Sequence, residues 1–121
     1  MSAKVLIVED AKFMRKMLRE IFKKAGYDVV GEAENCEKGI DLYKNKKPDL
    51  VTMDIIMPDM SGLEALKEIL EFDPNAKVVM CSALSQQAMV VDALQSGAKD
   101  FIEKPFQAEK IVEVAKKVLG E

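Results

Sequence analysis

The sequence predicts an open, doubly wound α/β fold, in which a five-stranded parallel sheet carries helices on both faces. Short apolar runs alternate with amphipathic segments along the whole chain, in five strand-then-helix units. The runs KVLIV, LVTM and KVVMC are apolar at successive positions, as is typical of strands buried on both faces. At 121 residues the chain is long enough for one core and too short for two. We therefore expect a single α/β domain.

The first half of the chain contains two of these units. A strand is expected at residues 4–8, and residues 11–25 carry apolar side chains at helical spacing. Gly26 follows this helix, at the position where glycine commonly ends helices. A weaker strand at 29–33 is followed by Asn35, a candidate N-cap for the second helix.

The third unit contains an acid at an unusual place. The apolar strand at 50–53 ends in Asp54, where burial disfavours charge. Ser61 and Glu64 then form an S-x-x-E capping box, which predicts a helix that ends at about Phe72.

The last two units complete the pattern. A strand is expected at 77–81, followed by a helix that Ser85 caps and Gly97 ends. A short strand at 101–102 and a helix after Pro105 finish the chain. Parallel strands joined by short connections favour the doubly wound arrangement, whose sites lie beyond the carboxyl ends of the strands.

Composition excludes several classes of function. The net charge of −3 does not favour bulk nucleic-acid or anionic-membrane binding. No signal peptide or membrane-length apolar run is present, so we expect a cytoplasmic protein. The absence of histidine excludes Ser-His-Asp and Cys-His catalysis, histidine-ligated zinc and a phosphohistidine of this chain's own. Cys36 and Cys81 have no C-x-x-C spacing and are interpreted as reduced core thiols.

Complementary polar groups follow four of the predicted strands. If the first and third strands are neighbours, Glu9, Asp10 and Asp54 converge, and their mutual repulsion favours a hard cation such as Mg²⁺. Lys104 beyond the fifth strand and Ser82 beyond the fourth add a cation and a hydroxyl. Together these residues suit phosphoryl chemistry at a carboxylate.

Each residue alone also has an ordinary structural explanation. Asp10 could be a helix N-cap, Glu9 a solvated loop acid and Asp54 a turn residue. Lys104 could be a surface charge, and Ser82 could satisfy a local backbone group. Their joint occurrence at the ends of separate strands favours the phosphoryl site over these separate explanations.

The motifs VLIVED, MDIIMPDMSG, CSA and SGAKDFIEKPF, in this order and spacing, resemble the receiver domains of two-component response regulators. Within that family the chain is similar to the single-domain, CheY-like chemotaxis type, and the resemblance covers essentially the whole chain. It implies a flavodoxin-like fold with strand order 2-1-3-4-5 and one receiver domain over residues 1–121 without an output domain.

The resemblance also implies a role for each site residue. Asp54 would be the phosphoacceptor, and Mg²⁺ would be held by Asp10, Asp54 and the Ile56 backbone carbonyl, with Glu9 acting through water. Lys104 would pair with Asp54 and then with the phosphoryl group. Ser82 and Phe101 would form a conformational switch and move inward together when Asp54 is phosphorylated. The Lys104–Pro105 peptide bond would be cis.

The implied partners are proteins. They are a CheA-like sensor histidine kinase, a flagellar or archaeal motor switch or adaptor protein, and a phosphatase; nucleic acid and membrane are not implied, and a monomer is expected. The chain would not be an enzyme beyond assisting its own phosphorylation and slow dephosphorylation. Ile56 and Leu84 are apolar where faster-hydrolysing relatives carry polar side chains, which predicts slow loss of phosphate.

Two alternative functions stay open on the sequence. One is a phosphorelay intermediate that passes phosphate to a histidine phosphotransfer protein. The other is a small aspartyl-phosphate hydrolase, although the first strand ends in VEDAKF and lacks the D-x-D of haloacid-dehalogenase-type phosphatases. A flavin-binding module is suggested by the fold class alone, and no Gly/Thr-rich phosphate loop follows the first strand.

Overall fold

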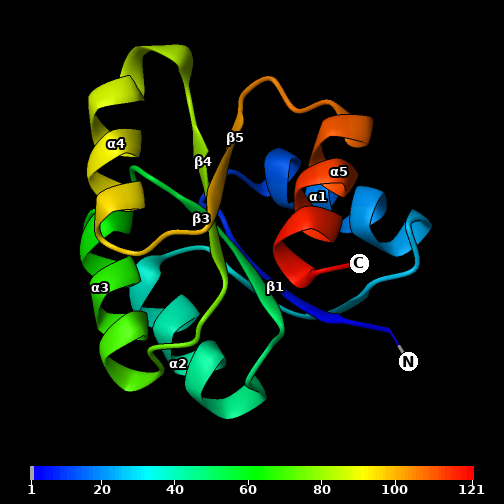
Figure 1. Cartoon of the computed structure of the whole chain (residues 1–121), viewed down its shortest axis with the longest axis horizontal. Helices are drawn as coiled ribbons and strands as arrows, with labels where there is room; N and C mark the ends of the chain where they lie inside the picture. Colours follow the sequence, from blue (N-terminus) through cyan, green and yellow to red (C-terminus); the bar gives the residue numbers. More distant parts are fainter. Residues whose placement is uncertain (1) are drawn as a thin grey trace.

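The computed structural model describes residues 2–121, which form one parallel sheet with helices on both faces (Figure 1). The spatial order of the strands is β2-β1-β3-β4-β5, and every neighbouring pair is parallel. The strands are β1 (Lys4–Val8), β2 (Asp28–Ala33), β3 (Leu50–Asp54), β4 (Val78–Ser82) and β5 (Asp100–Glu103). The predicted fold class and the strand order implied by the resemblance are both confirmed.

The helices alternate with the strands as the sequence pattern predicts. They are α1 (Lys12–Lys24), α2 (Cys36–Lys46), α3 (Gly62–Phe72), α4 (Gln87–Gln95) and α5 (Ala108–Leu119). Helices α1 and α5 cover one face of the sheet, and α2, α3 and α4 cover the other (Figure 1). Each face has its own apolar layer, so β1 and β3 are buried on both sides.

Two predicted helix caps are present. The Asn35 side chain accepts a hydrogen bond from the Lys38 amide at 2.8 Å, and the Ser61 hydroxyl accepts one from the Glu64 amide at 3.1 Å. Each bond satisfies a backbone donor that has no partner inside its own helix.

The start of α4 differs from the prediction. A short 3₁₀ turn, η1 (Leu84–Gln86), precedes α4, which begins at Gln87, so Ser85 is not its cap. The Gln86 side chain instead folds back and accepts a hydrogen bond from the Ala83 amide at 2.7 Å. The glutamine therefore caps the start of the 3₁₀ turn, and within residues 2–121 no side chain caps α4 itself.

The segment between β3 and α3 is closed on itself and anchored to α2. The Gly62 amide donates to the Ile55 carbonyl at 2.6 Å. Asp59 accepts from the Cys36 and Glu37 amides at 3.0 and 2.9 Å, at the N-terminus of α2. These backbone hydrogen bonds outweigh partial desolvation and lower the pKa of Asp59. The segment is thereby fixed at both ends, next to Asp54.

A Gly62→Ala substitution is expected to lower the free energy of unfolding by about 1–3 kcal/mol, the usual cost of overpacking. A Cβ at this position would collide with the Asp54 carbonyl oxygen and lie 2.9 Å from the Ile55 Cα, and backbone atoms cannot turn aside. Urea denaturation measures the change. Gly31→Ala is the matched control, because its nearest neighbours are the movable ends of the Leu6 and Leu42 side chains. Equal stabilities for the two variants would contradict this explanation.

Candidate functional site

The carboxyl ends of four strands meet at one edge of the sheet. Residues Val8 and Met53 are paired in the β1–β3 register, and Asp54 pairs with Cys81 across β3 and β4. The β4–β5 register ends with Ser82 opposite Glu103. The residues that follow these positions in the chain are thus brought together by strand pairing, as expected of a doubly wound sheet.

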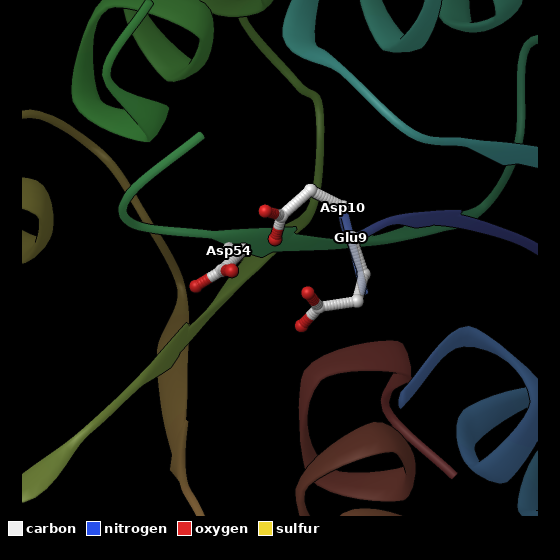
Figure 2. A group of neighbouring side chains, drawn as sticks. All are labelled: Glu9, Asp10 and Asp54. Atoms are coloured by element: carbon white, nitrogen blue, oxygen red, sulfur yellow. The ribbon is translucent and has the colours of Figure 1, made fainter. Parts of the chain in front are cut away.

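Three acids converge at this edge (Figure 2). Glu9, Asp10 and Asp54 each offer a carboxylate oxygen, and the three oxygens lie within 4.8 Å of one another. Glu9 and Asp54 are buried, with 1% and 5% of their surface exposed, whereas Asp10 is exposed. The predicted convergence of the carboxylates is confirmed.

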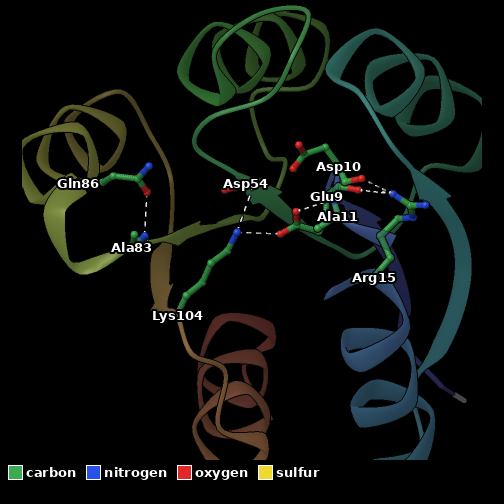
Figure 3. Close-up of polar contacts among 8 residues, drawn as sticks. All are labelled: Glu9, Asp10, Ala11, Arg15, Asp54, Ala83, Gln86 and Lys104. Atoms are coloured by element: carbon green, nitrogen blue, oxygen red, sulfur yellow. Dashed lines mark hydrogen bonds and ion pairs between the residues drawn. The ribbon is translucent and has the colours of Figure 1, made fainter. Parts of the chain in front are cut away.

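Lys104 lies between two of the acids (Figure 3). Its Nζ is 3.2 Å from Asp54 Oδ2 and 3.0 Å from Glu9 Oε1; the latter contact is an ion pair without hydrogen-bond alignment. The other Glu9 oxygen, Oε2, accepts from the Ala11 amide at 3.0 Å. Glu9, which is longer than an aspartate, therefore reaches the lysine directly and has both oxygens engaged.

The charges of the cluster do not balance. Burial, together with the nearby Asp54 charge, raises the pKa of Glu9 to about 6 against an opposing hydrogen bond from Ala11. Burial likewise raises the pKa of Asp54, although Lys104 opposes this shift. Desolvation lowers the pKa of Lys104, but its ion pairs with Glu9 and Asp54 outweigh that and raise it. A single lysine is thus paired with two buried carboxylates, and Asp10 adds a third acid. The cluster therefore carries excess negative charge that a further cation could neutralise.

In buffer with EDTA, we expect the free energy of unfolding to fall as the pH rises through about 6. The pKa of Glu9 is about 6 in the folded state and 4.5 in its unperturbed state, so the folded protein holds this proton more tightly. The resulting stabilisation is complete below pH 4.5 and is lost as the pH rises through the folded-state value. The shift corresponds to about 2 kcal/mol at most.

Urea denaturation between about pH 5 and pH 7 measures this slope. Glu9→Gln should flatten the profile, because it removes the titrating group. A wild-type stability that rises across this range would contradict the assignment.

The groups beyond β4 and β5 lie where the sequence places them. Ser82 is buried, and its carbonyl accepts from the Lys104 amide at 2.8 Å. The Lys104–Pro105 peptide bond is cis. Phe101 is 38% exposed, so its side chain is not packed in the core.

Exposed apolar side chains follow the ends of β3 and β4. Ile56, two residues after Asp54, has 52% of its surface exposed, and Leu84, two residues after Ser82, has 63% exposed. No polar side chain occupies either position.

Three residues near the site were not predicted from the sequence. They are Arg15, whose guanidinium donates to the Glu9 and Asp10 carbonyls, Asp59, which anchors the segment after β3, and Gln86, which binds the Ala83 amide. Asp59 binds amides 23 and 22 residues away, and Arg15 binds the carbonyls of residues just before its own helix, so no standard local motif identifies these contacts. The Gln86 contact spans three residues and matches the glutamine position of a capping box, a local signal that could have predicted it.

Comparison with known proteins identifies the family. The family described as response regulator receiver domain matches residues 5–116. The chain belongs to the response regulator receiver domain family. It is a CheY-like chemotaxis response regulator: the chemotaxis protein CheY of Thermotoga maritima is 58% identical over 118 residues, which cover 98% of both chains. CheY of Bacillus subtilis is 55% identical over 120 residues, 99% of this chain and all of that one.

Solved structures agree with the receiver fold. The chain is similar to one chain of a solved Borrelia burgdorferi complex described as CheX-CheY-BeF3-Mg. The TM-score is 0.92 and the identity is 42%, over 96% of this chain and 88% of the Borrelia chain. Within residues 2–121 of the receiver domain, no helix has the length and apolar character needed to cross a membrane.

Proposed function

We propose that this receiver domain accepts a phosphoryl group on Asp54 from the phosphohistidine of a CheA-like kinase. The observation that carries the proposal is the pairing of a buried Asp54 with Lys104, beside two further acids at the sheet edge. In the transfer, the phosphorus–nitrogen bond to the donor histidine breaks and a bond from phosphorus to an Asp54 carboxylate oxygen forms. The leaving imidazole stays on the kinase.

The donor set fits Mg²⁺. It consists of carboxylate oxygens within 4.8 Å of one another, and Mg²⁺ prefers oxygen ligands. Asp10, Asp54 and the Ile56 carbonyl would hold the ion, and Glu9, with both oxygens engaged, would act through water. When bound, the ion supplies positive charge that offsets the carboxylates and the phosphoryl oxygens.

The residues of this chain supply position and charge. The β3 strand and the closed segment after it hold Asp54 in place, so the acceptor oxygen is oriented before the donor arrives. Lys104, already at 3.2 Å from Asp54, would pair with a phosphoryl oxygen once the carboxylate is esterified. The Ser82 hydroxyl would donate a hydrogen bond to another phosphoryl oxygen. The Phe101 side chain would move inward with Ser82.

Acetyl phosphate provides a direct test. Incubation with this donor should add one phosphate per chain, measured by intact-protein mass spectrometry, and only when Mg²⁺ is present. Phosphate that appears equally in EDTA, or on a residue other than Asp54, would overturn the proposal.

We propose that the phosphorylated form acts by binding another protein, a motor switch or adaptor. The support is the similarity to CheY proteins and the exposed apolar side chains of α4 and β5, namely Val91, Leu94 and Phe101. A CheX-type protein is a further candidate, because the Borrelia CheY is found in a complex with CheX. A pull-down from native lysate with beryllofluoride-treated protein, with Asp54→Asn as the control, tests for such partners. Rapid transfer of phosphate from this chain to a histidine phosphotransfer domain would instead support the phosphorelay role.

Loss of phosphate from the modified protein is expected to be slow, with a half-life of minutes or longer. Ile56 and Leu84 present apolar, exposed side chains that cannot orient an attacking water. Ile56→Asn combined with Leu84→Glu should shorten the half-life severalfold, whereas Ile56→Val should leave it unchanged. Decay of the phosphorylated species after removal of acetyl phosphate is the measurement. A wild-type half-life of only seconds would contradict this reasoning.

A further inference from the structure

Arg15 on α1 contacts the backbone of Glu9 and Asp10 rather than their side chains (Figure 3). Its Nη1 donates to the Glu9 carbonyl at 2.8 Å and to the Asp10 carbonyl at 2.9 Å. These carbonyls belong to the peptide groups on either side of the Asp10 Cα. A single guanidinium nitrogen therefore fixes both peptide planes that set the backbone angles of Asp10.

The second of these peptide groups is held from both sides. Its carbonyl accepts from Arg15, and its amide, that of Ala11, donates to Glu9 Oε2 at 3.0 Å. The direction of the Asp10 Cα–Cβ bond follows from the two peptide planes. Within residues 2–121, the Asp10 carboxylate has no hydrogen bond or ion pair of its own. The backbone is consequently what directs this exposed carboxylate toward Asp54.

Arg15 is itself held in place. Its side chain is 16% exposed, and its Nε lies 4.0 Å from Glu32 Oε1 on β2. The other Glu32 oxygen pairs with Arg19 Nη1 at 2.9 Å. The arginine is thus fixed between an acid on the neighbouring strand and the end of β1.

We propose that Arg15 is a positioning residue for the metal site, which raises Mg²⁺ affinity by fixing the backbone of Asp10. This inference rests on the proposed function, since it assumes that Asp10 is a ligand. Groups that orient metal ligands commonly affect affinity strongly when they are removed. A purely electrostatic role for Arg15 makes the opposite prediction. If Arg15 acted only as a nearby positive charge that repels the metal ion, its removal would tighten Mg²⁺ binding.

The test compares Arg15→Ala, Arg15→Lys and Arg19→Ala with the wild type. The readout is the rise in melting temperature of the unphosphorylated protein as MgCl₂ is increased, fitted to the logarithmic dependence of stability on ligand concentration to obtain the dissociation constant, which is the half-saturating Mg²⁺ concentration. We expect Arg15→Ala to raise this concentration about tenfold. Arg15→Lys, which keeps a donor and the charge, should restore part of the affinity.

Arg19→Ala is the matched control, because it breaks the shorter ion pair with Glu32 but touches neither carbonyl. It should lower the melting temperature without changing the Mg²⁺ dependence. A second readout is the rate of phosphorylation by acetyl phosphate at varied Mg²⁺. In Arg15→Ala the rate at saturating Mg²⁺ should stay near the wild-type value while the half-saturating concentration rises.

A half-saturating concentration for Arg15→Ala that lies within twofold of the wild type, or below it, would overturn the inference. An equal loss of affinity in Arg19→Ala would overturn it as well, because general destabilisation would then explain the effect. A wild-type protein that Mg²⁺ does not stabilise would overturn both this inference and the metal assignment. A wild-type protein that binds Mg²⁺ but takes no phosphate from acetyl phosphate would overturn the phosphoryl-transfer proposal alone.

Discussion

An Asp54→Asn variant is expected to incorporate no phosphate from acetyl phosphate and yet to be more stable than the wild type in EDTA. Loss of the carboxylate removes the acceptor oxygen of the proposed reaction. It also removes a buried charge, 5% exposed, whose pKa is raised because burial disfavours its ionised form. Relief of that penalty should increase the free energy of unfolding by about 1–2 kcal/mol. Intact-protein mass spectrometry and urea denaturation measure the two effects.

Asp59→Asn is the matched control for this prediction. It makes the same chemical change in the segment after β3, but Asp59 binds the amides of Cys36 and Glu37 at the start of α2. An asparagine can accept through one oxygen only, so this variant should lose stability by about 1 kcal/mol and keep its phosphorylation. We infer that burial of the ionised Asp54 carboxylate lowers the free energy of unfolding. An Asp54→Asn variant that is less stable than the wild type in EDTA would contradict this inference.

A Lys104→Ala variant is expected to be phosphorylated by acetyl phosphate about 10²–10³-fold more slowly, the usual cost of removing one preorganised charge donor. Lys104 Nζ lies 3.2 Å from Asp54 and 3.0 Å from Glu9. Within residues 2–121 no other lysine or arginine forms an ion pair with either acid. In EDTA the variant should also lose about 3 kcal/mol of stability, because Glu9 and Asp54 would remain buried without a cation. Adding Mg²⁺ should restore part of this stability.

The double variant Lys104→Ala with Glu9→Gln separates the two contributions. Neutralising Glu9 should recover stability, because one of the uncompensated charges is gone, while phosphorylation should stay slow. Lys110→Ala, a surface lysine of α5 with 59% of its side chain exposed, is the control for loss of positive charge alone. A Lys104→Ala variant that is phosphorylated at the wild-type rate would remove Lys104 from the proposed mechanism.

Local sequence patterns were sufficient for most of the fold. Asn35 and Ser61 cap the helices that follow them, and the strand runs are buried on both faces, because caps and alternating apolar segments depend on neighbouring residues only. The errors have two different origins. Ser85 is not the cap of α4, because it lies inside a 3₁₀ turn, Leu84–Gln86, and the helix begins only at Gln87. Phe13 fits the apolar spacing of α1 but is 70% exposed, since the sheet is reached only by the other side of that helix.

The residue types of the proposed phosphoryl site could be predicted from the sequence alone. Acids after two strands, a hydroxyl after a third and a lysine after the last can meet only if parallel strands end at one edge. The contacts that hold these groups in place appear only in the folded structure. Glu9 pairs with Lys104, Arg15 fixes the peptides around Asp10, and Asp59 anchors the segment after Asp54 to α2. These contacts join residues from different elements, and their geometry depends on how the helices pack on the sheet.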